Sequence, residues 1–261
     1  MKDEYLLQLQ QLIVCGNAEL AIQLAKAINI DIADVYSAIL KKIGLPLPFK
    51  GYATAEEIVT FFLKRSFLYC DNDQLTKLDV SCNTALESLD CHDNQLTTLD
   101  VSRNTALKSL SCYNNQLTKL DVSRSTGLKN LDCHNNQLTT LDVSRSTALK
   151  SLRCDSNQLT KLDVSRNTAL DVFYCDFNQL ETLDVSCNKA LEHLYCHDNQ
   201  LTTLDVSNTA LKYLYCSNNQ LTTLDVSRNT ALVYLNATGN NFSKSEQARI
   251  QAALPSCKMF F

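Results

Sequence analysis

The sequence predicts an α/β repeat solenoid, in which short parallel strands stack into a coil between a helical N-terminal cap and a helix–strand C-terminal cap. Three observations support this prediction. A unit of about 21 residues recurs over roughly two thirds of the 261-residue chain. Each unit contains two short segments in which apolar and polar residues alternate. The residues on either side of the repeats have the apolar spacing of amphipathic helices instead.

The repeat follows the pattern L-x-C-x-x-N-Q-L-T-x-L-D-V-S-x-N-T-A-L-x-x. Eight full units and a partial ninth fit it, and they begin at Leu68, Leu89, Leu110, Leu131, Leu152, Phe173, Leu194, Leu214 and Leu235. Self-similarity at a fixed period is the signature of a repeat architecture, in which every unit contacts only its neighbours.

Each unit contributes two extended segments. In the first, Leu89 and Cys91 point to one side of the chain, while Asp90 and His92 point to the other. The second segment, "LDVS", alternates in the same way. Neither segment can bury its apolar side alone, so we expect units to stack at the strand spacing of ~4.8 Å. Extended chain on both sides of the coil predicts a straight stack.

Polar residues at fixed offsets predict how the coil turns. Asn94 and its equivalents follow the first segment, and Asn104 and its equivalents follow the second, with Ser125 and Ser146 as substitutes. Asparagine amides can bond backbone groups that a turn leaves unpaired. The repeated cysteine serves as a small buried hydrophobe; this series is Cys70, Cys91, Cys112, Cys133, Cys154, Cys175, Cys196 and Cys216.

Read across a unit junction, "LKSLSCYNNQL" is L-x-x-L-x-C-x-x-N-x-L. This pattern resembles the leucine-rich repeat, with cysteine in a slot usually held by leucine. The unit length and the second half, "LDVSRNTAL", are similar to the short bacterial class called IRREKO. The resemblance implies a right-handed coil, a bacterial source and a non-enzymatic binding function.

The predicted domains are residues 1–67, 68–241 and 242–261. Apolar residues at helical spacing in the first, such as Ile32, Val35 and Ile39, predict a helical cap, with a separate partner-binding domain as the alternative. In the last, Ser243 and Glu246 predict a capping box that opens a helix ending at Pro255. A final strand is expected to follow that helix.

Composition argues against several classes of function. The net charge of −4 gives no reason to expect nucleic acid or an anionic membrane as partner. No run approaches the ~20 apolar residues of a membrane span, and the start of the chain does not resemble a signal peptide. We therefore expect a cytoplasmic protein, while an exported form remains open.

Three columns of chemically active side chains have structural explanations. The cysteine column lacks the paired spacing of a zinc site. The aspartate column, which begins at Asp79, alternates with Lys and Arg, so charge compensation explains it better than calcium does. His92 and His134 are two coils apart, about 10 Å, too far for one metal ion. We expect no metal, cofactor or catalytic residue.

The outward positions of the L-x-C segment vary between units and become aromatic towards the C-terminus. We predict that this patch binds a protein partner, because tyrosine combines apolar area with a polar tip; its residues are Tyr174, His193, Tyr195, His197, Tyr213, Tyr215 and Tyr234. Alternatively, these aromatics only stabilise the sheet. A structural or surface-attachment protein and an enzyme subunit using residues 1–66 remain further alternatives.

Overall fold

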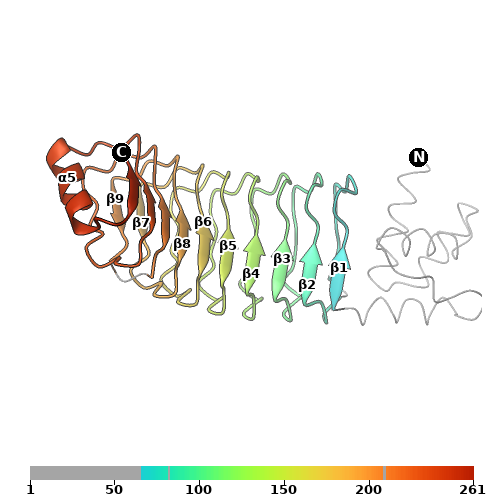
Figure 1. The fold of residues 1–261 in the computed structure, drawn as a ribbon. Coiled ribbons are helices and arrows are strands. Elements are labelled where there is room, and N and C mark those ends of the chain that lie inside the picture. The colour runs from blue at the N-terminus through green and yellow to red at the C-terminus, as the bar shows by residue number, and fades with distance from the viewer. Residues whose placement is uncertain (1–65, 82, 208–209) are drawn as a thin grey trace, which may run out of the picture.

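The computed structural model describes residues 66–261, except residues 82 and 208–209. The helical cap expected over residues 1–67, and the enzyme alternative that depends on residues 1–66, lie outside the described residues apart from Ser66 and Phe67. The described part is a stack of coils arranged in one row (Figure 1). No helix in this part of the chain is long and apolar enough to cross a membrane.

One side of the stack is a ten-stranded parallel sheet in the order β1-β2-β3-β4-β5-β6-β8-β10-β11-β12. Neighbouring strands pair one coil apart, so that Leu89 lies opposite Leu110 and Leu110 opposite Leu131. The strands are β1 (Phe67–Tyr69), β2 (Ser88–Asp90), β3 (Ser109–Ser111), β4 (Asn130–Asp132), β5 (Ser151–Arg153), β6 (Val172–Tyr174), β8 (His193–Tyr195), β10 (Tyr213–Tyr215), β11 (Tyr234–Asn236) and β12 (Lys258–Phe260).

The other side of the stack has less regular structure. Strands β7 (Thr182–Asp184) and β9 (Thr203–Asp205) pair in parallel there, and Asp79 forms an isolated bridge with Asp100. The L-x-C segment thus forms a strand in every coil, whereas the L-D-V segment forms one only in two of the described coils. We call the outward side of the ten-stranded sheet the sheet face, and the side carrying β7 and β9 the opposite face.

The core lies between these two sides and is filled by the repeated leucines, valines and cysteines. Leu89, Cys91 and Val101 are each at most 1% exposed, and their equivalents form one continuous buried cluster along the stack. Cys70, in the first described coil, is only partly buried. The predicted core is therefore confirmed, including the role of cysteine as a small apolar side chain.

Asparagine side chains link consecutive coils at the corner after each sheet strand. The Oδ1 of Asn115 accepts a hydrogen bond from the backbone N–H of Leu96 at 2.9 Å. Its Nδ2 donates to the carbonyls of Cys91 and Cys112. The same pattern recurs in the following coils, so the predicted asparagine ladder is present.

The C-terminal helix α5 (Lys244–Ala253) covers the end of the stack, as predicted. The side chain of Ser243 caps it by accepting from the backbone N–H of Glu246 at 3.1 Å. The Glu246 carboxylate goes to the last coil, where it accepts from the Leu224 N–H, while Arg249 donates to the Leu224 carbonyl. Side chains of α5 thus take the place of a further coil at Leu224.

Candidate partner-binding face

The structure places six of the seven predicted site residues on β6, β8, β10 and β11, and His197 just after β8. All these strands are neighbours in the ten-stranded sheet, so residues from units 20 or 21 positions apart come together. Tyr213 is 36% exposed, whereas Tyr174, Tyr195, Tyr215 and Tyr234 are half-buried. The strands place these aromatic residues on one face of the sheet, as the two-residue alternation of the sequence indicated.

The tyrosine rings on this face stack along the coil axis. The ring centroids of Tyr174 and Tyr195 lie 4.2 Å apart, with an angle of 6° between the ring planes. Tyr195 and Tyr215 follow at 4.6 Å and 9°. Parallel stacking at the strand spacing leaves the ring edges and hydroxyl groups, rather than the ring faces, directed away from the sheet.

The row continues beyond the predicted residues at both ends. Tyr234 contacts Tyr215 at 4.9 Å, and Phe260 contacts Tyr234 at 5.6 Å. The Arg153 guanidinium lies 5.0 Å from the Tyr174 ring centroid, and the Lys258 ammonium lies 5.3 Å from that of Phe260. We call Tyr174, Tyr195, Tyr215, Tyr234 and Phe260 the tyrosine ladder; a cation covers each of its ends.

Two further aromatic pairs border the ladder. His193 and Tyr213 stack at 4.9 Å, and His197 meets the edge of Phe177 at 5.2 Å. Phe177 is 53% exposed and takes a φ of 50°, a left-handed conformation that is unusual for a bulky residue. The prediction from sequence missed Phe177, although aligning the units shows Asn, Asp, Ser or Gly at this position in the others.

A group of charged side chains adjoins the Arg153 end of the ladder. Arg153 lies 3.6 Å from a carboxylate oxygen of Asp132 and 3.8 Å from one of Asp155, while His197 lies 3.5 Å from Asp176. Burial raises the pKa of the Asp155 carboxyl and raises that of Asp176 to about 6, against the opposing effect of nearby cations. The Oδ1 atoms of Asp155 and Asp176 are buried without a hydrogen-bond partner.

The N-terminal part of the sheet face is more acidic. Tyr113 stacks between His92 and His134 at centroid distances of 4.3 and 4.4 Å. The Nδ1 of each histidine lies within hydrogen-bond distance of a carboxylate, Asp90 for His92 and Asp132 for His134. The sheet face therefore changes from acidic to aromatic along the stack.

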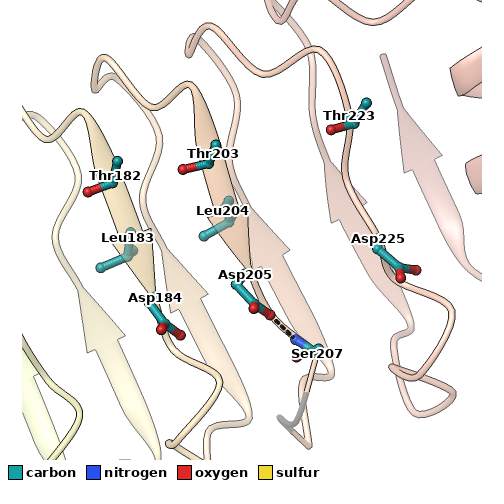
Figure 2. Close-up of a pocket in the computed structure, with 9 residues that line it drawn as sticks. All are labelled: Thr182, Leu183, Asp184, Thr203, Leu204, Asp205, Ser207, Thr223 and Asp225. Atoms are coloured by element: carbon teal, nitrogen blue, oxygen red, sulfur yellow. Dashed lines mark hydrogen bonds between the residues drawn. The ribbon is translucent and has the colours of Figure 1, made fainter.

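The opposite face carries a shallow groove of about 400 Å³, lined by residues of β7, β9 and the next coil (Figure 2). Its carboxylates already serve the turns: Asp205 accepts from the Ser207 backbone N–H, and Asp184 accepts from that of Ser186. Hydrogen bonds from Ser102 likewise hold the pKa of Asp100 below its usual value, with a smaller contribution from Arg103. The aspartate column thus caps turns in addition to balancing nearby cations.

The described residues offer little reactive chemistry. Among them, no group of three or more His, Cys, Asp or Glu side chains could hold a metal ion. Burial raises the pKa of the thiols in the cysteine column, which keeps them protonated. A buried, protonated thiol is a poor nucleophile. The buried thiols of the described residues are therefore poorly suited to covalent chemistry.

Comparison with known proteins agrees with the repeat pattern. A family model described as leucine-rich repeats (two copies) matches residues 84–125, 105–146 and 189–229. The described part of the chain has a leucine-rich-repeat solenoid fold. No curated protein sequence matches the chain.

Solved leucine-rich-repeat structures support the same conclusion. The functional domain of InlJ from Listeria monocytogenes is 41% identical over 75% of this chain and 43% of its own, with a TM-score of 0.70. The Leptospira interrogans protein LIC12759 is 26% identical over 80% of this chain and 58% of its own, also with a TM-score of 0.70. The chain spans less than two thirds of either protein. The InlJ domain includes a cysteine ladder. The buried cysteine column described above is a comparable feature of this chain.

Proposed function

We propose that this leucine-rich-repeat protein is a non-enzymatic module that binds a protein partner on its sheet face, with the main contacts on the strands from β6 to β12. The tyrosine ladder is the observation that carries the proposal. Leucine-rich-repeat solenoids present extended surfaces that commonly bind proteins. The bacterial source and the short 21-residue repeat class remain predictions from the repeat pattern.

The arrangement of the ladder favours tight binding for two reasons. Tyrosine supplies a large apolar area and a hydroxyl group, and it is enriched at the residues that contribute most to interfaces. The stacked rings are also held by their neighbours at 4.2–4.9 Å, so their rotamers are largely fixed before a partner arrives. Binding therefore costs little side-chain entropy at these positions.

Variation between the coils also favours the sheet face. Its outward positions differ from coil to coil, whereas the opposite face repeats Thr, Lys and Asp. A repeated surface provides the scaffold, while side chains that differ from place to place can distinguish one partner from another. We also propose a cytoplasmic location, where a reducing environment keeps the thiol column unoxidised.

A capture experiment in an extract of the source cell tests the function. The full chain is compared with a Tyr174→Ala/Tyr195→Ala/Tyr215→Ala variant and with a control, Thr182→Ala/Thr203→Ala/Thr223→Ala, on the opposite face. We expect the control to capture as much partner protein as the unmodified chain. The tyrosine variant should capture at least ten-fold less. Circular dichroism confirms that both variants are folded.

Equal capture by both variants would contradict the proposed site. If the tyrosine variant retained the partner but unfolded at a lower temperature, the ladder would serve only to stabilise the sheet. That result would support the structural alternative.

A further inference from the structure

We propose that the tyrosine ladder binds an extended, acidic segment of a partner protein, whose carboxylate and carbonyl oxygens meet the ring edges and hydroxyl groups. This inference rests on the proposed function and specifies the chemistry of the partner. Three features of the described residues support it: the closed ring faces, the hydroxyl donors and the charge distribution along the sheet face.

The rings of Tyr174 and Tyr195 are contacted on both faces. Tyr174 lies between Arg153 and Tyr195, and Tyr195 lies between Tyr174 and Tyr215. At the other end, the Phe260 ring contacts Tyr234, and the Lys258 ammonium lies 5.3 Å from its centroid. A sugar ring, a nucleobase or a quaternary amine would need an open ring face for stacking or cation–π contact. Tyr174 and Tyr195 do not offer one.

The ring edges and hydroxyl groups remain available. An aromatic ring carries partial positive charge at its edge and negative charge on its faces, so an exposed edge attracts oxygen atoms. Burial raises the pKa of Tyr195 to about 12, and a hydrogen bond with Tyr174 contributes. The phenols therefore keep their protons at neutral pH; the bond between Tyr195 and Tyr174 takes up one of their two hydroxyl protons, and the other can be donated to an outside acceptor. Carboxylate oxygens are the strongest acceptors that a peptide segment can supply.

The charge distribution favours an anionic segment at this end of the sheet. The outward residues of β8, β10, β11 and β12 include no carboxylate and one exposed lysine; they are His193, Tyr195, Tyr213, Tyr215, Tyr234, Asn236, Lys258 and Phe260. Among the bordering carboxylates, Glu192 is paired with Lys212, and Asp176 and Asp198 lie 3.5 and 3.9 Å from the His197 ring.

Towards β2 and β4, Asp90 and Asp132 point outward. An acidic segment would meet repulsion there, so its contact should end near β5. The five strands from β6 to β12 span four strand spacings, or about 19 Å. An extended segment of about six residues covers that distance.

Selection from a random dodecapeptide display library tests the inference without a known partner. The full chain is the target, and phage that also bind a Tyr195→Ala/Tyr215→Ala variant are removed. We expect the surviving peptides to be enriched in Asp and Glu next to apolar residues and depleted in Lys and Arg. The most enriched sequence is then synthesised for titration against the full chain.

The titration distinguishes donation by the hydroxyl group from general apolar contact. Tyr174→Phe/Tyr195→Phe keeps both rings and removes both hydroxyls of the pair, so we expect an about ten-fold higher dissociation constant, as for one lost hydrogen bond to a charged group. Lys258→Gln should weaken binding several-fold and reduce its salt dependence. Thr203→Ala on the opposite face should leave binding unchanged.

The outcomes separate this inference from the proposed function. Basic peptides that depend on Tyr195 and Tyr215 would overturn the acidic segment and leave the sheet face as a binding site. An absence of enriched peptides would also count against the segment, while capture from the cell extract decides the function independently. If Tyr174→Phe/Tyr195→Phe binds as tightly as the unmodified chain, the proposed donation by these ladder hydroxyls is wrong.

Discussion

Phe177 shows how a single residue can oppose the backbone it occupies. Its φ of 50° belongs to a region in which side chains other than Gly, Asn and Asp cost about 1–2 kcal/mol. Equivalent positions with positive φ elsewhere hold Asp93, Asn114 and Asn135. The ring gains contact with His197 but remains 53% exposed, so packing does not fully offset the strain. Strained positions of this kind concentrate at functional sites.

We therefore expect Phe177→Asn to raise the free energy of unfolding by up to about 1 kcal/mol, because asparagine tolerates the left-handed conformation. The reciprocal control, Asn135→Phe, should lower it by about 1–2 kcal/mol. Chemical denaturation of the full chain measures both changes. A destabilised Phe177→Asn variant would show that the contact with His197 outweighs the backbone strain.

Asp176 gives the sheet face a charge that depends on pH. Its pKa is raised to about 6, chiefly by burial, so the folded chain keeps this proton at pH values where the unfolded chain has lost it. The contribution of Asp176 to stability therefore falls as pH rises from about 4 to about 6 and is constant above that range.

Removing this charge should stabilise the protein when the carboxyl is ionised. We expect Asp176→Asn to unfold at a higher temperature than the unmodified chain at pH 7.5, with a much smaller difference at pH 4. Thermal unfolding followed by circular dichroism across this range provides the measurement. Asp171→Asn, at an exposed position in the same coil, is the control. If the difference in unfolding temperature between Asp176→Asn and the unmodified chain did not vary with pH, the raised pKa of Asp176 would be refuted.

At the scale of the structural elements, the two asparagine series are not equivalent. Asn115 uses both ends of its amide, and its Oδ1 is the acceptor for the Leu96 N–H. Asn104 donates through Nδ2 to the Val80 and Asn83 carbonyls, while its Oδ1 is buried without a partner. Serine can replace asparagine in the second series, as Ser125 and Ser146 show, because no backbone donor depends on that oxygen.

This difference predicts unequal costs for the same substitution. Asn115→Ser leaves the buried Leu96 N–H unsatisfied and should cost roughly 2–3 kcal/mol. Asn104→Ser removes a donor to carbonyls that also accept from the backbone N–H groups of Asn83 and Leu86, so it should cost about 1 kcal/mol. Urea unfolding of the two variants tests the ranking. Equal costs would mean that both corners use the amide in the same way.

The predictions from sequence were accurate where the period repeats and incomplete where it stops. Alternation within the unit placed Tyr174, Tyr195 and Tyr215 on one face, and stacking then fixed their distances. Phe260 and Lys258 belong to β12, which lies outside the period, so nothing in the repeat aligned them with the ladder. The pairing of Glu246 with Leu224 was also missed, because a capping-box pattern does not show which backbone the carboxylate reaches.

Across the whole molecule, one column of thiols runs through the core. Seven of the cysteines on the repeat are fully buried, whereas Cys187 lies exposed at a corner. Because each coil contacts only its neighbours, access to a buried thiol requires neighbouring coils to separate. The reactivity of each buried thiol therefore measures how readily the stack opens at that position.

Alkylation by iodoacetamide at pH 8, followed by peptide mass spectrometry, should reveal this opening. We expect Cys187 to react within minutes, and Cys112, Cys133 and Cys154 to react only at the rate at which the coils open. Denaturant should make all of them reactive, which confirms that burial is the cause. Rapid labelling of Cys133 in the native protein would contradict the closed core.

The side chains of Glu246 and Arg249 on α5 complete the hydrogen bonding of Leu224, and β12 pairs with β11, so these contacts of the terminal cap involve only the last two units of the stack. Duplicating the unit that carries β4 would lengthen the molecule by one strand spacing, about 4.8 Å, without altering any contact made by the cap. The length of the acidic region is thus a count of repeats, adjustable in whole steps while the aromatic region keeps its composition.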